Sequence, residues 1–328
     1  VIGRDKYVVE DAVNAVEVEY DVREAVLDPE IALLPDSPRV YSDWDDNVVY
    51  HQHFSGGDIE QAFANADLVV SQRFRSGRSG ASPMEPRASI AEYSAAEGLT
   101  VWLTTQRSHI KRHLLAEYFK IPDSKIRVIA PKDVGGGFGV KAPLYREDIV
   151  LCHLSMCLKR PLKWVENRQE NLVNIGQERD QINDLEIAAS KDGKLLALRN
   201  RGIADNGIGC TGVYWGFVMP FLGAIEMPNA YTWPKADIKL RVATTNKASL
   251  TPSRAFGHFP TRFALERAID KLADDRAIGL GQVVGRARGV GRVAVKLFHG
   301  LVGGTAADPQ FALAPQGAVK QPRAATGV

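Results

Sequence analysis

Cysteine is scarce in this sequence, because 328 residues include only Cys152, Cys157 and Cys210. Three cysteines cannot form a disulfide framework or a four-thiolate iron–sulfur site within the chain, and such a low number predicts a reducing, cytoplasmic environment. A hydrophobic run of about 18 residues, long enough to span a membrane, is also missing. Near Val1 no charged segment precedes an apolar one, as it would in a secretory signal. We therefore expect no membrane partner.

A large excess of charge is lacking too, since 41 basic residues face 39 acidic ones. The exception is the stretch 276–328, which has seven Lys or Arg residues, one acid (Asp308) and ten glycines. One interpretation is a nucleic-acid-binding arm, but Phe298 and Phe311 are the only aromatic residues there for base stacking. We favour a disordered or off-frame tail and expect no nucleic-acid partner.

Apolar residues are plentiful, at 45% of the chain, which is enough for a large core. Apolar spacing predicts a short helix in "GDIEQAFANAD", and alternation predicts a strand in "LVVSQRFRS". Hairpins are expected around Glu97-Gly98 and Asp192-Gly193, and a helix capped by Ser108 around "HIKRHLLAEYFK". Because helices and strands alternate without a regular βαβ rhythm, we predict an α+β fold of mixed sheets with packed helices.

Four glycines occur in nine residues at "DVGGGFGVK", residues 133–141, which we call the glycine loop. Glycine is favoured where φ is positive or where another group approaches the backbone closely. Val140 separates Gly139 from Lys141, so the stretch matches neither a P-loop nor a dinucleotide-binding fingerprint. Two interpretations remain: a nest of N–H groups for an oxyanion or metal-oxo group, or a tight turn without a ligand.

The glycine loop is one of five motifs that occur together in a particular order and spacing. The other four motifs are "ASPMEPRASI" (81–90), "TTQ" ending at Gln106, "KRPLKWVENRQEN" (159–171) and "TTNKASLTPSRAFGHFPTRFALERAID" (244–270). With these five motifs in this order, the chain resembles the large, molybdopterin-binding subunit of the molybdenum hydroxylases, the superfamily of xanthine dehydrogenase, aldehyde oxidase and carbon monoxide dehydrogenase. The resemblance covers roughly residues 1–275.

The resemblance implies a domain organisation. Residues 1–27 would end an α/β hammerhead-like domain, residues 28–58 would be a connector, and residues 59–275 would form the first molybdopterin-binding domain. Residues 276–328 would be the Gly/Arg-rich tail. Large subunits of the family are more than twice as long, so we expect this chain to be a fragment.

The resemblance also implies cofactor-binding residues. Molybdopterin with molybdenum, in its plain or cytosine dinucleotide form, would lie against Gly136, Gly137, Phe138 and Gly139, where the Gly139 N–H would bond an oxo ligand. Gln106 would approach from the other side as a catalytic residue. The pterin sulfurs would hold the metal, so no metal ligand is expected from the protein. His109 and His113 have zinc-like spacing but lack the adjacent glutamate of hydrolytic zinc helices.

Residues that would shape catalysis and substrate choice follow from the same resemblance. Arg254 matches an arginine of the second active-site loop, and Phe256 matches an aromatic wall beside the substrate. Ala142 stands where the xanthine-oxidising branch has a purine-binding glutamate. Ala255 stands where the CO-oxidising branch has a copper-holding cysteine. An aldehyde or N-heterocycle is therefore the expected small-molecule substrate.

The resemblance finally implies partners. Iron–sulfur and FAD subunits would accept electrons, and the missing C-terminal half would supply much of the pterin site and the glutamate base. Asp133, Glu147 and Asp148 flank the glycine loop, but none is a credible base, so this chain alone is expected to be inactive. The alternative is a catalytically inactive fragment that is at most a weak anion-binding module.

Overall fold

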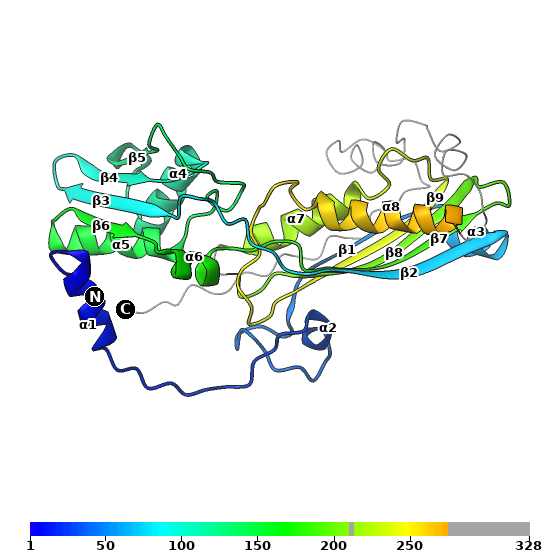
Figure 1. The fold of residues 1–328 in the computed structure, drawn as a ribbon, viewed down its shortest axis with the longest axis horizontal. Helices are drawn as coiled ribbons and strands as arrows, with labels where there is room; N and C mark the ends of the chain where they lie inside the picture. The colour runs from blue at the N-terminus through cyan, green and yellow to red at the C-terminus, as the bar shows by residue number, and fades with distance from the viewer. Residues whose placement is uncertain (210–212, 275–328) are drawn as a thin grey trace.

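Two β-sheets with packed helices make up the two halves of the computed structural model, which describes residues 1–209 and 213–274 (Figure 1). The predicted α+β class is confirmed. No helix among these residues is both long and apolar enough to cross a bilayer. The predicted tail at 276–328 lies outside the described residues.

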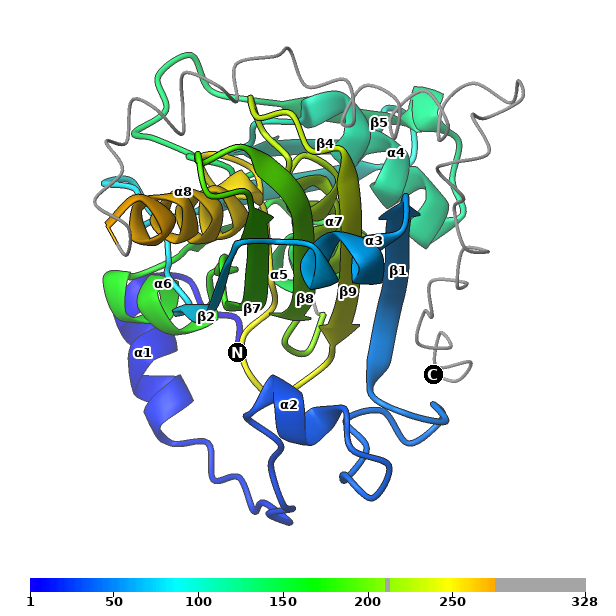
Figure 2. The same cartoon turned by 90° about the vertical axis from the view of Figure 1, so that its right-hand side faces the viewer.

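The larger sheet has five strands in the order β1-β9-β8-β7-β2, and only β8 and β9 are parallel (Figure 2). Helices α7 and α8 contact one face, and the short helix α3 contacts β8 and β9. The bounds are β1 Val48–Gly56, β2 Leu68–Ser76, β7 Gln181–Ala189, β8 Leu195–Asp205, β9 Lys235–Ala243, α3 Ile59–Ala64, α7 Val213–Ile225 and α8 His258–Asp274.

Apolar periodicity explains how these helices attach to the sheet. In α8 the residues Ala264, Ala268 and Leu272 recur at helical spacing and are at most 1% exposed. They join the core that also contains Leu198 of β8, whereas the neighbouring Ala197 packs under α3. Successive strand residues point to opposite faces, so α8 and α3 cover opposite sides of the sheet.

The smaller sheet has four strands in the order β5-β4-β3-β6, and β4 and β5 are parallel. Helices α4 and α5 share one buried cluster with this sheet, which includes Leu115, Leu151 and Val101. The bounds are β3 Ala88–Ser94, β4 Gly98–Leu103, β5 Ile126–Ile129, β6 Leu162–Val165, α4 Ser108–Phe119, α5 Arg146–Leu158 and α6 Arg168–Asn174. The remaining elements are α1 Lys6–Asn14, α2 Pro29–Ala32 and the 3-10 turn η1 Asp123–Lys125.

Some elements differ from the sequence-based expectations. Residues 48–56, placed in the connector, form β1 and pair with β9 near residue 240. The prolines and turn residues near β1 could not reveal this pairing, because the partner strand β9 is remote in sequence. Ser108, which was expected to cap α4, is its first residue, and the helix has no side-chain cap hydrogen bond. Of the two described cysteines, Cys152 is buried and Cys157 is exposed.

A buried cluster of ion pairs links Asp180, just before β7, and Asp205, at the end of β8, to Lys247, which follows β9. Asp180 lies 2.9 Å from Arg78 Nε and 3.0 Å from Lys247 Nζ, and Asp205 lies 3.0 Å from the same Lys247 atom. Burial alone would raise the pKa of Asp180, but the two cations outweigh it and the pKa is lowered. The pKa of Asp237 is lowered in the same way, because Arg201 and His53 outweigh its burial.

These lowered pKa values predict acid sensitivity. The unfolded chain takes up protons near pH 3.9 whereas the folded carboxylates resist them, so stability is complete above that value and falls as pH drops toward the folded-state pKa. Each such carboxylate adds up to about 1.4 kcal/mol of lost stability per pH unit. Urea unfolding followed by tryptophan fluorescence between pH 3 and 7 measures this loss. Asp180→Asn should flatten the slope, and the exposed Glu97→Gln should not; equal slopes in all three proteins would contradict the prediction.

Candidate functional site

Two parallel strands bring the glycine loop to Gln106. Because β4 and β5 run parallel, their carboxyl ends lie at one edge of the smaller sheet. Gln106 follows β4, and residues 133–141 follow β5. The Gln106 N–H donates to the carbonyl oxygen of Lys141 at 3.3 Å, which fastens the end of the loop to the end of β4.

Close packing by the protein itself explains the glycines of this loop. A Cβ on Gly137 would lie 2.6 Å from Gln106 Oε1, and a Cβ on Gly139 would lie 2.5 Å from the Pro252 carbonyl oxygen. Gly139 also has a φ of +107°, which disfavours any side chain there. The loop can therefore touch both Gln106 and a second loop because it lacks side chains at these positions. Gly135 similarly lies against Glu85, and Gly136 lies against the Phe138 ring.

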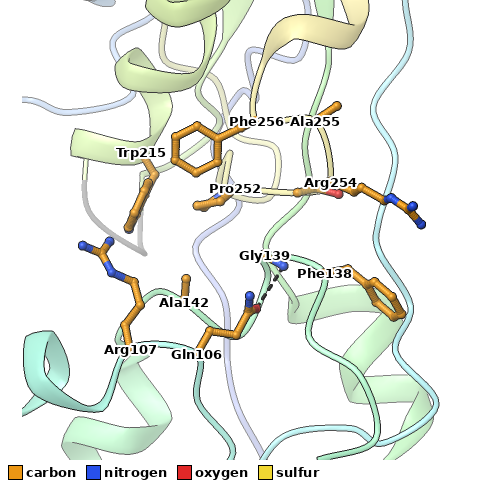
Figure 3. A pocket seen from close by; sticks show the side chains of 11 residues that line it. Gln106, Arg107, Phe138, Gly139, Ala142, Trp215, Pro252, Arg254, Ala255 and Phe256 are labelled. Atoms are coloured by element: carbon orange, nitrogen blue, oxygen red, sulfur yellow. Dashed lines mark hydrogen bonds between the residues drawn. The ribbon is translucent and has the colours of Figure 1, made fainter.

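The Gly139 N–H donates a hydrogen bond to Gln106 Oε1 at 2.9 Å (Figure 3). The two groups that were expected on opposite sides of a cofactor thus contact each other directly. The other end of the Gln106 amide, the Nε2 group, has no hydrogen-bond partner among the described residues. Gln106 is exposed, so this donor is available to a bound molecule.

Glu85 fastens both ends of the glycine loop. Its Oε2 accepts from the Gly135 N–H at 2.9 Å and lies 2.7 Å from the Nζ of Lys141, whose side chain is fully buried. Arg168 in turn donates to the carbonyl of Pro83 at 2.7 Å and holds the Glu85 segment in place. Glu85 is therefore a structural residue of the glycine loop.

The second loop, residues 252–257, crosses from the larger sheet and leads into α8. Ala255, Phe256 and Gly257 have consecutive positive φ values of +80°, +48° and +88°. The left-handed region costs a non-glycine residue roughly 1–2 kcal/mol. A hydrogen bond from the Phe256 N–H to the Ser253 carbonyl at 2.9 Å helps to hold the turn. Strained backbone of this kind concentrates at functional sites.

A pocket of about 480 Å³ opens between the two loops (Figure 3). All predicted site residues line the pocket except Gly136 and Gly137, which come just before Phe138 in the glycine loop. Figure 3 shows the Arg254 guanidinium pointing away from Gln106 and Trp215. The lining residues are Gln106, Arg107, Phe138, Gly139, Ala142, Trp215, Pro252, Ser253, Arg254, Ala255 and Phe256.

Four lining residues were not expected from the sequence. Arg107 directly follows Gln106, so the sequence could have predicted that it lies near the pocket. Trp215 comes from α7 and offered no local signal, because the fold alone brings α7 to the pocket. The Arg107 guanidinium carbon lies 4.9 Å from the centre of the Trp215 ring. Pro252 and Ser253 complete the wall.

No acidic residue lines the pocket in the part of the chain that the structure describes. The nearby acids serve other contacts: Glu147 lies 3.3 Å from Arg87, and Asp133 is exposed outside the pocket. Asp148 accepts from Ser89 at 2.6 Å and lies 3.2 Å from Lys111. Burial alone would raise the pKa of Asp148, but the Lys111 ammonium and hydrogen bonds outweigh burial and lower it.

No group of three or more His, Cys, Asp or Glu residues that could hold a metal ion occurs within residues 1–209 and 213–274. The pocket instead offers hydrogen-bond donors and apolar walls. This composition suits a bound group that carries oxygen atoms and negative charge.

Comparisons with known proteins extend this description. Residues 40–283 match the family described as the molybdopterin cofactor-binding domain. The chain is 32% identical over 283 residues to the nicotine 6-hydroxylase large subunit of Paenarthrobacter nicotinovorans. It is 38% identical over 293 residues to the carbon monoxide dehydrogenase large chain of Hydrogenophaga pseudoflava. Each alignment covers 83% of this chain but only 34% or 36% of the relative, so the chain spans about a third of their length.

The fold is also found in solved structures. Quinoline 2-oxidoreductase from Pseudomonas putida 86 superposes with a TM-score of 0.83 and 31% sequence identity. That superposition covers 88% of this chain and 38% of the other. The architecture described above is therefore shared with this oxidoreductase over most of the present chain.

Proposed function

This chain belongs to the molybdopterin cofactor-binding domain family, and on that premise we propose that it is a segment of the large subunit of a molybdenum-dependent hydroxylase or dehydrogenase. The enzyme would oxidise an aldehyde, an N-heterocycle or a similar small molecule with water as the oxygen source. The observation that supports this most is the pocket that joins Gln106, Gly139 and Phe256. A cytoplasmic location is part of the proposal and rests on the low cysteine content.

The residues of the pocket fit such a cofactor. Gly139 packs against Pro252 and its N–H is bonded to Gln106 Oε1, so the donor that these residues offer a cofactor is the Gln106 Nε2 group. Molybdopterin, in its plain or cytosine dinucleotide form, would be held along Gly136, Gly137 and Phe138 in addition to these residues. When bound, it supplies two-electron redox chemistry; the chain's own residues position it and the substrate.

Within the proposal each catalytic residue has a stated task. Gln106 donates a hydrogen bond from its amide and orients the reacting groups. It does not act as an acid or a base, because an amide neither holds nor accepts a proton at neutral pH. Arg254 is exposed, has no ion-pair partner among the described residues and supplies positive charge at the rim. Phe256 provides an apolar wall. The proton-accepting carboxylate, together with iron–sulfur and FAD partner subunits, would lie outside this chain.

Two alanines limit the substrate. Ala142 is buried in the pocket wall and has no acceptor for a purine N–H. Ala255 has no sulfur for copper, and no described cysteine lines the pocket. We therefore propose neither xanthine nor carbon monoxide as the substrate.

Molybdenum content tests the proposed function. The chain purified from a host that makes the cofactor should contain molybdenum near one atom per chain, measured by inductively coupled plasma mass spectrometry. Gly139→Ala places a methyl group against the Pro252 carbonyl in a left-handed conformation. That strain of roughly 1–2 kcal/mol should lower the molybdenum content about tenfold.

The matched control is Gly80→Ala, because nothing lies within 4 Å of a Cβ built at Gly80. This control should keep the molybdenum content of the unchanged chain. Background molybdenum in the unchanged chain would refute cofactor binding and favour the alternative, a catalytically inactive fragment that at most binds anions weakly. Equal content in both variants would show that the close packing of Gly139 on Pro252 is not needed for cofactor binding.

A further inference from the structure

The hydroxyl group of Tyr145 bonds to two chain segments that are remote from each other in the sequence. It donates to the Val140 carbonyl oxygen at 2.6 Å, near the end of the glycine loop. The same oxygen accepts a hydrogen bond from the Gly176 N–H at 3.3 Å. All three residues are buried, and the low local dielectric strengthens both bonds. One phenol therefore holds the glycine loop and the segment at Gly176 together.

Gly176 is in turn fastened to the strand that enters the second loop. The neighbouring Gln177 donates from its N–H to the Ser249 carbonyl at 3.0 Å and accepts from the Thr251 N–H at 2.7 Å. Gly176 also packs on Thr251, because a Cβ built at Gly176 would lie 1.9 Å from Thr251 Cγ2. Thr251 directly precedes Pro252, where the second loop begins. The contacts of Gly176 and Gln177 thus fix the entry to the second loop.

No direct hydrogen bond joins the two loops of the pocket, although the structure describes residues 133–141 and 252–257 in full. Gly139 instead packs against Pro252, which faces it from the second loop (Figure 3). Packing contacts have little directionality, whereas a hydrogen bond weakens steeply away from its preferred distance and angle. The route through Tyr145 and Gly176 therefore supplies a directional link that packing alone lacks.

Tyr145 is itself held by groups outside both loops. It directly precedes helix α5, and its N–H donates to Asp148 Oδ2 at 3.3 Å. The Arg87 guanidinium carbon lies 3.8 Å from the centre of its ring. Burial raises the pKa of the Tyr145 hydroxyl although the Arg87 charge opposes this, so the group keeps its proton and remains a donor. The phenol is a fixed point from which both segments are positioned.

We infer that Tyr145 is a positioning residue whose hydroxyl sets the separation between the glycine loop and the second loop, and with it the width of the pocket. Tyr145 does not line the pocket and acts through Gly139 on one side and Phe256 on the other. The inference rests on the proposed function for what fills the pocket. The link between the loops is a property of the chain alone and can be measured without cofactor.

Hydrogen–deuterium exchange of the whole chain, read by mass spectrometry, tests this inference. Tyr145→Phe keeps the ring and removes the hydroxyl, so the Val140 carbonyl and the Gly176 N–H lose this partner. Peptides that contain the amides of Val140, Gly176 and Thr251 should exchange about tenfold faster, the effect expected for a buried group left unsatisfied. Peptides of β8 should exchange at an unchanged rate. The molybdenum content does not enter this measurement, so its outcome is separate from that of the proposed function.

The matched control is Tyr50→Phe. Tyr50 is also buried, and its hydroxyl donates to Gln52 Oε1 at 2.8 Å, but it lies in β1 of the larger sheet. This control should leave exchange in both loops unchanged. A second variant, Tyr145→4-aminophenylalanine, keeps an N–H donor for Val140 but is a poor acceptor for Gly176. It should speed exchange at Gly176 and Thr251 and spare Val140.

Three results would overturn the inference. Faster exchange in β8 to the same extent as in the loops would show that the hydroxyl only contributes to overall stability. Faster exchange at Val140 with Thr251 unchanged in Tyr145→Phe would show that the hydroxyl supports one loop and does not link the two. Unchanged exchange at all three amides would show that it holds neither.

Discussion

Arg87→Ala will lower the free energy of unfolding by about 3–5 kcal/mol, because it leaves a buried carboxylate without its partner. Arg87 is 4% exposed, and its Nη2 and Nε atoms lie 2.5 and 3.0 Å from Glu166 Oε1. Its guanidinium carbon also lies 3.8 Å from the centre of the Tyr145 ring. Tyr145 donates to the Val140 carbonyl at 2.6 Å, so the same substitution removes a support of the glycine loop.

Urea unfolding followed by tryptophan fluorescence measures this loss. Arg267→Ala is the control, because Arg267 pairs with Asp270 at 2.9 Å but is 58% exposed, and no measurable loss is expected there. The double variant Arg87→Met with Glu166→Gln should be more stable than Arg87→Ala, since no unpaired charge remains buried. A loss below about 1 kcal/mol for Arg87→Ala would show that Glu166 is solvated or paired elsewhere.

The chain supplied with molybdopterin cofactor will oxidise aldehydes no faster than the cofactor alone. The family reaction implied by the resemblance needs a carboxylate base, and general-base catalysis typically contributes about 10²–10⁴-fold. No such base is available in the pocket: its described lining has no acid, Glu147 faces Arg87, and Asp148 is held by Lys111 and Ser89. The assay follows aldehyde-dependent reduction of an artificial dye acceptor.

Two controls make the expected inactivity informative. Molybdenum content must be measured on the same sample, so that inactivity is not confused with absence of the cofactor. The second control is a set of three variants in which each nearby acid is neutralised: Asp133→Asn, Glu147→Gln and Asp148→Asn. Turnover by the unchanged chain that disappears in one of these variants would identify that acid as the base and would contradict the prediction.

Much of the fold could be predicted because its signals are local. The hairpins around Gly98 and Gly193 and the helix α3 follow from alternation, turn residues and helical spacing within short windows. β1 could not be predicted, because its partner β9 lies far along the chain and the proline-rich stretch before it resembled a connector. Pairing between remote strands depends on their packing and leaves little trace in either segment alone.

The sequence by itself determined that four glycines cluster at residues 133–141 and that five motifs, one of them ending at Gln106, together resemble one family. Glycine spacing and motif order are local properties that need no packing to be read. Only the tertiary structure decided what the glycines touch, which residues share the pocket and which charges are neutralised. Gln106, Pro252 and Trp215 come from three separate parts of the chain. Among the described residues, the fold brings the Trp215 ring, and no acid, to Arg107.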